Sequence, residues 1–160
     1  MILTPGDKAL WFPEVKLSGS ALRAAIARSQ MTAESSKGAN RPLELQGHVE
    51  VKQLHITAQS CYLSRIPIAE LPEPKIEARC GGHKDGFGRL YPISAWQVVP
   101  VDGYDLDYGT GRLQLAGGLA IATEIRATYT AGFDFAEDTP QTRNIKAAVA
   151  AILVYQTLEA

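Results

Sequence analysis

The sequence predicts an α+β fold in which a mostly antiparallel β-sheet, built largely of hairpins, packs with an N-terminal and a C-terminal helix. Two stretches carry this prediction. Residues 124–133 alternate polar and apolar side chains with the two-residue period of a strand. Residues 140–158 begin with a proline and then place apolar side chains at helical spacing.

Size and composition favour one soluble domain that spans residues 1–160. The chain is 46% hydrophobic and 21% charged, which is ordinary for a globular protein, and its formal net charge is −1. This charge gives no general reason to expect binding to nucleic acid or to an acidic membrane. No apolar run approaches the ~20 residues that span a bilayer. Residues 1–7 lack the features of a signal peptide, so we expect synthesis in a cytoplasm.

The N-terminal part should contain an irregular docking segment, residues 1–19, and then a helix over residues 20–37 that Gly38 can end. We expect Trp11 and Phe12 to pin the docking segment to the body of the protein or to a neighbouring subunit. A thin stripe follows the helix at Leu22, Ala25, Ile26, Ser29 and Ala33. Because so narrow a stripe buries little area, this helix should be weakly held or should pack against another copy of itself.

Residues 48–130 should be rich in β-strands. The apolar side chains move from odd-numbered to even-numbered positions between Val51 and Leu54. This change of face predicts a bulge or a turn near residues 52–53. Residues 75–80 alternate cleanly and predict a strand with one apolar face. The other face of that strand should be solvated and carries Lys75, Glu77 and Arg79.

Two further strand regions follow. Residues 96–101 contain Pro100, so this strand should lie at a sheet edge or carry a bulge. Residues 104–115 predict a hairpin that reverses at residues 109–111 and has acidic side chains at its turn. A long alternating strand over residues 119–130 comes next.

The last helix should span residues 139–159, with Asp138 or Thr139 as its cap. Its apolar side chains are not confined to one stripe, because Ala147, Ala150, Ala151 and Val154 add to the regular pattern. A helix that is apolar on most sides has to be buried in a core or against other subunits.

No metal or cofactor site emerges from the residue types. Cys80 and His83 have a spacing that could bind a metal, but no second pair of ligands supports a structural zinc site. The aspartates from Asp102 onwards resemble a calcium loop only briefly, because Ala116 stands where the bidentate glutamate should be. The glycines of residues 81–91 precede neither a helix nor a phosphate-binding lysine motif.

No catalytic site emerges either. The chain has no Gly-x-Ser-x-Gly elbow, and no spacing singles out a Ser, His and Asp triad. The two cysteines, Cys61 and Cys80, suit free thiols in a reducing compartment, and a single disulfide between them stays open. The enzymatic alternative is a hydrolase that uses His83 with one of three carboxylates, Asp102, Asp105 or Asp107.

Three motifs in the final third of the chain resemble one known family. They are residues 104–113 (YDLDYGTGRL), residues 125–133 (IRATYTAGF) and residues 140–155 (PQTRNIKAAVAAILVY). In this combination they resemble the head–tail connector proteins of tailed bacteriophages, also called neck adaptor or head-completion proteins. The family usually opens with two closely spaced helices, whereas this sequence predicts one.

The resemblance implies a non-enzymatic structural protein of the virion neck, assembled in the host cytoplasm and needing no cofactor. Members form homo-oligomeric rings of about twelve copies, and such a dodecamer needs a head-to-tail interface that closes. The ring would bind the portal protein and the next neck or tail protein. It would extend the channel through which double-stranded DNA passes during genome ejection, with no membrane partner.

We expect the partner interfaces to include Trp11, Phe12, Phe87, Thr110, Ala147, Ala151, Val154 and Tyr155. These residues come from the docking segment, the glycine-rich loop, the hairpin tip and the last helix. Two alternatives stay open: a tail-completion or tail-terminator protein of similar architecture, or a small cytosolic binding domain.

Overall fold

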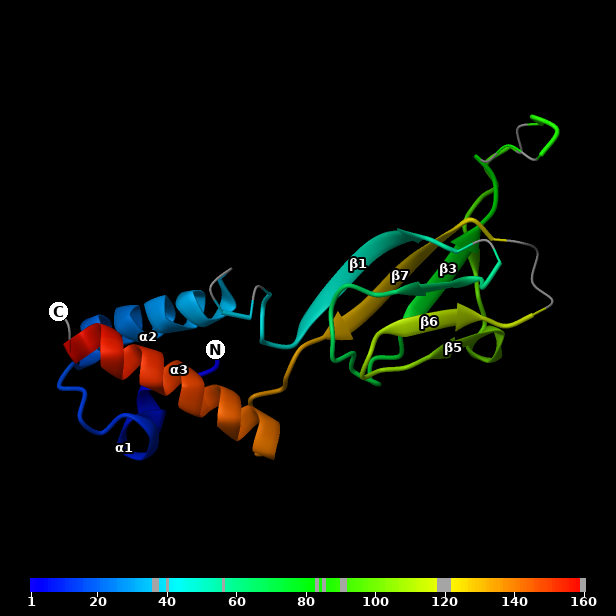
Figure 1. Ribbon diagram of the computed structural model, residues 1–160. Helices are drawn as coiled ribbons and strands as arrows, with labels where there is room; N and C mark the ends of the chain where they lie inside the picture. The colour runs from blue at the N-terminus through cyan, green and yellow to red at the C-terminus, as the bar shows by residue number, and fades with distance from the viewer. Residues whose placement is uncertain are drawn as a thin grey trace. The chain divides into compact units, whose positions relative to one another are not determined.

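The structure is a computed structural model. It describes residues 1–35, 38–39, 41–55, 57–82, 84, 86–89, 92–117 and 122–158. The chain divides into two compact units, a helical unit (residues 1–45 and 133–160) and a sheet unit (residues 46–132) (Figure 1). Helices at both ends of the sequence and antiparallel sheets between them confirm the α+β class. Where one domain was expected from the chain length, each unit has a hydrophobic core of its own.

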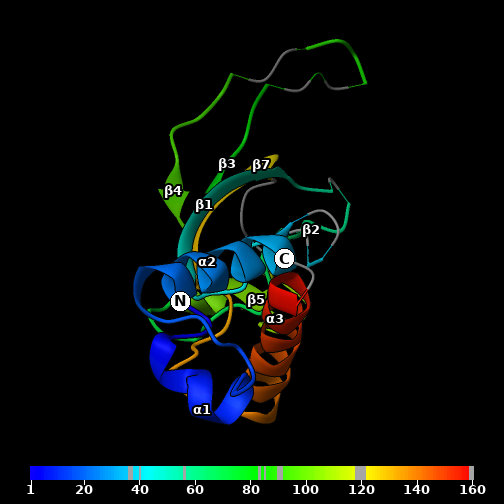
Figure 2. The same cartoon turned by 90° about the vertical axis from the view of Figure 1, so that its left-hand side faces the viewer.

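The helical unit is built around two long helices, α2 (Gly19–Glu34) and α3 (Pro140–Leu158). They lie side by side in both views (Figures 1 and 2). The bounds of α3 match the sequence-based prediction within one residue at either end. Thr139 caps α3, because its Oγ1 accepts the N–H of Thr142 at 3.2 Å and its own N–H donates to Thr142 Oγ1 at 2.9 Å.

The N-terminal segment is more regular than expected. A 3₁₀ turn, η1 (Pro5–Asp7), leads directly into a short helix, α1 (Lys8–Trp11). The Asp7 carboxylate accepts both the N–H of Thr4 at 2.7 Å and the Thr4 hydroxyl at 2.8 Å. This reciprocal cap, with Pro5 in the first turn, starts the helical conformation where the sequence pattern predicted an irregular segment.

The stripe of α2 is covered within the chain. All five predicted stripe residues are buried in α2. The four apolar ones share a core with Val149 and Leu153 of α3 and with Ile2, Leu3 and Phe12 from the N-terminal segment. The stripe therefore does not need a second copy to cover it, because the segment before α2 supplies apolar area that the stripe itself lacks.

The sheet unit contains two antiparallel sheets. The larger has the order β1-β7-β3-β4, and its strands are β1 (Gln46–Gln53), β3 (Lys75–Arg79), β4 (Gln97–Val98) and β7 (Glu124–Ala131). The smaller has the order β2-β6-β5, with β2 (Ser60–Tyr62), β5 (Tyr104–Leu106) and β6 (Arg112–Leu115). Buried side chains from both sheets, such as Ile125 and Leu113, form one core.

Strand β1 departs from its predicted pattern. It pairs with β7 without interruption from Gln46 to Gln53, so no bulge or turn occurs at residues 52–53. Val49 and Val51 are exposed, whereas His48, Glu50 and Lys52 point to the half-buried side. The chain turns instead at residues 57–59, where Gln59 donates its N–H to the His55 carbonyl at 2.7 Å.

Polar side chains can occupy the inner side of β1 because they find partners there. Glu50 accepts the Tyr129 hydroxyl at 2.6 Å, the Ser64 N–H at 2.7 Å and the Ser64 hydroxyl at 2.7 Å. These bonds hold the pKa of Glu50 below its ordinary value, although burial acts in the opposite direction. Burial and the bond to Glu50 raise the pKa of Tyr129.

Other strands lie where the sequence predicted them, although β4 covers only Gln97–Val98 of the predicted residues 96–101. The residues of β7 alternate between buried and more exposed positions along its length, and β4 lies at a sheet edge. Strands β5 and β6 form the predicted hairpin. The predicted start of the β7 strand at residues 119–121 lies outside the described residues. Within the described part of the chain, no helix has the length and apolar character needed to span a membrane.

The burial of Phe12 generates a first prediction. Replacing Phe12, which is 0% exposed, by alanine should lower the free energy of unfolding by about 3–5 kcal/mol, because it leaves a cavity in the helical core. Leu10→Ala is the matched control: Leu10 is 77% exposed, so we expect a change within about 0.5 kcal/mol. Urea unfolding followed by far-ultraviolet circular dichroism measures both. Equal effects of the two substitutions would contradict the assignment of Phe12 to the core.

Candidate functional site

A shallow apolar groove on the helical unit is the strongest candidate for a functional site. Its volume is about 470 Å³, and it runs along α3 beside the end of α1. The lining residues come from the N-terminal segment and from the second half of α3: Trp11, Glu14, Ala147, Ala150, Ala151, Val154, Tyr155 and Leu158. Ala150 is buried, whereas Tyr155 is 63% exposed and Leu158 is 75% exposed.

The groove exists because α3 carries apolar residues on two sides. One side, with Val149 and Leu153, is fully used by the helical core. The other side has small residues at Ala147 and Ala151, and small side chains leave room where larger ones would fill the surface. Trp11 provides an aromatic surface from a segment far away in the sequence. The result is an apolar surface in which Glu14 is the charged residue among the described lining residues.

Most of the expected interface residues lie together in this groove. Trp11, Ala147, Ala151, Val154 and Tyr155 all line it. Whether a partner contacts them stays a prediction. The interface residues expected from the sequence did not include Glu14, Ala150 and Leu158. The excess of apolar residues in the last helix was the sequence feature that indicated this region.

Phe12 does not belong to this surface. Its side chain is 0% exposed and packs in the helical core, so it is not accessible to a partner in this fold. The neighbouring Trp11 is half-buried and faces the groove. The aromatic pair was expected to hold the N-terminal segment either to the same chain or to a neighbouring subunit. Phe12 holds it to the same chain.

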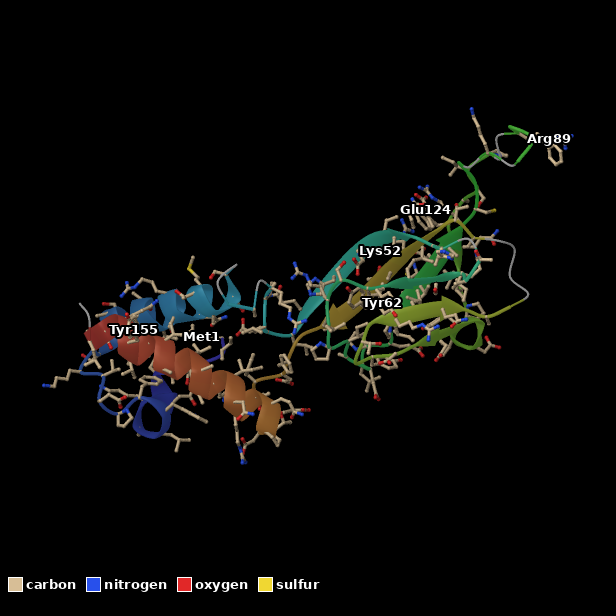
Figure 3. All side chains as sticks on the ribbon, viewed as in Figure 1. Met1, Lys52, Tyr62, Arg89, Glu124 and Tyr155 are labelled. Carbon is tan, nitrogen blue, oxygen red and sulfur yellow. The ribbon has the colours of Figure 1, made fainter. Side chains whose placement is uncertain are left out.

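The two remaining expected interface residues belong to the sheet unit. Thr110 lies at the tip of the β5–β6 hairpin and is exposed. Phe87 lies in the connection between β3 and β4 and is 92% exposed. Figure 3 shows the neighbouring Arg89 at the far end of this connection, away from the strands of the sheet unit. Apart from the buried Phe12, the expected residues therefore lie in the groove of the helical unit and at these two tips of the sheet unit.

Asp107 shapes the hairpin tip. Its Oδ1 accepts the N–H of Thr110 at 3.0 Å and the N–H of Gly109 at 2.9 Å. These bonds hold the pKa of Asp107 below its ordinary value, with the Thr110 N–H as the largest cause. The aspartate that the sequence offered to a calcium loop or a hydrolase thus closes a turn.

The outer face of the larger sheet carries an aromatic and charged cluster, defined here as Trp96, Arg79, Arg126, Glu77 and Glu124. The Trp96 ring lies 4.4 Å from the Arg79 guanidinium carbon and 4.9 Å from that of Arg126. Such distances are typical of cation–π contacts. Arg126 also donates two hydrogen bonds of 2.8 Å to Glu77, and Arg79 pairs with Glu124.

This cluster changes the expected character of the β3 face. Glu77, predicted to be solvated, is 7% exposed. The bidentate Arg126 pair, aided by Lys75, lowers the pKa of Glu77 to about 2. Both arginines are thereby occupied by carboxylates and by Trp96, which leaves them poorly suited to bind phosphates.

The thiols and histidines offer little chemistry within the described residues. Cys61 and Cys80 are both free. Burial raises the pKa of the Cys61 thiol to about 11, so it stays protonated at neutral pH and is a weak nucleophile. Among the described residues, no group of three or more His, Cys, Asp or Glu side chains could hold a metal ion. His83, which the metal and hydrolase alternatives need, lies outside them.

The Glu77–Arg126 pair predicts how stability responds to acid. Because the pKa of Glu77 is about 2 in the folded chain and 4.5 ordinarily, the pair stabilises the fold fully above about pH 4.5. That stabilisation is lost as the pH falls towards 2. We expect Glu77→Gln to make the free energy of unfolding depend less steeply on pH between 4.5 and 2. Glu70→Gln, which changes an exposed carboxylate, is the control and should keep the wild-type slope. Urea titrations at a series of pH values measure the slopes, and identical slopes for all three proteins would contradict this role of Glu77.

Comparison with protein-family models and with curated proteins finds no match to this chain.

Proposed function

We propose that this chain is a non-enzymatic structural subunit of the neck of a tailed bacteriophage. Copies of it would form a ring that joins the portal protein to the next connector or tail protein and extends the DNA channel. The observation that carries the proposal is the apolar groove on α3, which matches a surface that needs a partner. The resemblance of residues 104–155 to head–tail connector proteins is the reason to expect a ring in the virion neck as the assembly.

The exposed side of α3 supports an interface rather than a solvated helix. Ala147, Ala151, Tyr155 and Leu158 follow one another at about helical spacing and are all exposed. Contiguous apolar surface of this kind is typical of protein–protein contacts. Small residues within it would let a partner's backbone or side chain approach closely, and Trp11 and Tyr155 are residue types that often dominate interface energies.

The charges support a channel through which DNA passes without being held. The formal net charge is −1. Several arginines are paired with carboxylates within the same unit: Arg79 with Glu124, Arg126 with Glu77 and Arg143 with Asp138. Tight binding to DNA needs cations that are available to neutralise phosphates. These three paired arginines are less available to phosphates, which suits transient passage better than tight binding.

The alternatives differ in the partner they need. A tail-completion or tail-terminator protein would use the same groove but would join tails instead of portal-containing heads. A small binding domain would use the groove for a cellular ligand and would not enter a virion. Both remain candidates behind the neck protein, because the resemblance favours a connector.

Assembly measurements test the proposal. The mass of the purified protein should be measured by size-exclusion chromatography with light scattering, alone and after incubation with portal-containing particles. We expect either a closed ring in solution or incorporation into the particles. A protein that stays monomeric and never joins such particles would contradict the proposal. A protein that joins isolated tails instead would favour the tail-completion alternative.

A pair of substitutions on α3 tests the groove itself. Ala151→Glu places a charge among the lining residues and should reduce incorporation at least tenfold, because a buried unpaired charge at an interface is strongly unfavourable. Ala148→Glu is the matched control, since Ala148 is exposed on the same helix but does not line the groove. Circular dichroism should show equal helix content in both variants. Equal incorporation of the two variants would rule out the groove as the interface.

A further inference from the structure

The apolar groove needs an occupant that is apolar at its tip and positively charged beside it. Its lining contains three large side chains around small alanines: the half-buried Trp11 and the exposed Tyr155 and Leu158. The charged lining residue is the carboxylate of Glu14. A complementary segment would insert an aromatic or aliphatic side chain between the large residues and bring a cation to Glu14.

The tip of the β3–β4 connection has these properties. Phe87 is 92% exposed, the highest value among the exposed large hydrophobic residues of the described chain. Lys84 and Arg89 stand on either side of it, and with Asp85 included residues 84–89 keep a formal net charge of +1. A Cβ added at Gly86 or Gly88 would meet no described atom within 4 Å, so the backbone on both sides of Phe87 stands clear of the sheet unit. Figure 2 shows this connection extending away from the strands.

Another exposed apolar tip fits less well. Leu71 is 81% exposed, but it stands between Glu70 and Glu73. Those carboxylates would face Glu14 and repel it, whereas Lys84 and Arg89 would attract it. Leu71 also lacks the ring that can stack against Trp11 and Tyr155.

We propose that Phe87 of one copy inserts into the groove of a second copy, with Lys84 or Arg89 placed next to Glu14. This inference rests on the proposed function, because it names the partner of the groove within the ring. In a ring this contact is heterologous: the tip of each copy enters the groove of the next. Repetition of one heterologous contact produces a ring if the rotation closes and a filament if it does not.

Two complementary variants test the contact. Phe87→Ala removes the tip and keeps the groove, whereas Ala151→Glu blocks the groove and keeps the tip. Each variant alone should remain monomeric under conditions in which the wild type assembles. A mixture of the two should form a 1:1 heterodimer and nothing larger, because only one tip and one groove are left to pair. Light scattering and sedimentation velocity measure these masses. Ile93→Ala is the control for the tip, since Ile93 is 63% exposed in the same connection, and it should assemble like the wild type.

Charge reversal tests the polar part of the contact. Glu14→Lys and Lys84→Glu should each weaken association about two- to fivefold, as expected for a pair at an interface rim. The double variant should recover much of the loss, because the reversed charges attract again. If the double variant associates no more tightly than the weaker of the two single variants, Lys84 does not pair with Glu14.

The outcomes separate this inference from the proposed function. If Phe87→Ala assembles and joins portal-containing particles like the wild type, the tip-in-groove contact is wrong and the neck function stands. If the wild type forms filaments that Phe87→Ala abolishes, the contact is supported and ring closure is not. If the wild type is monomeric at every concentration and in the presence of portal-containing particles, both are overturned.

Discussion

Pairing of β7 on both of its edges is the constraint on which the sheet unit depends. β1 and β3 each align with it in antiparallel register, so one strand fixes two segments that are distant in sequence. One face of β7 buries Ile125, Ala127 and Tyr129 in the core. The other face brings Arg126 to Glu77 and Glu124 to Arg79. A single alternating strand thus organises the apolar core and the charged face together.

Sequence patterns predicted the elements whose environment is local. The stripe of α2, the bounds of α3 and the alternation of β7 follow from the periodicity and capping of a single segment. The facing of β1 did not, because it depends on distant partners: Tyr129 is 79 residues from Glu50 in the chain. The alternation of residues 48–51 alone did not show which face of β1 would be buried. Only one side of the groove could be predicted. The sequence of α3 showed more apolar residues than one buried stripe needs, but it did not indicate that Trp11 would lie beside this helix.

The two units divide the tasks that the proposed assembly requires. The helical unit has an apolar core that is complete without the exposed side of α3, so this side can bind a partner with no change in folding. The sheet unit pairs Arg79 and Arg126 internally and extends a tip from the β3–β4 connection. Because the tip and the groove are formed by different residues, each copy can bind the next one through both of them in a repeated head-to-tail contact.

The two tryptophans of the chain fall one in each unit, Trp11 beside the groove and Trp96 against the paired arginines. Their fluorescence therefore comes from two distinct environments. A Trp96→Phe protein would keep one emitter, placed at the candidate contact surface. The wavelength of that emission would shift to the blue when a partner excludes water from the groove, which makes assembly visible in solution without an added label.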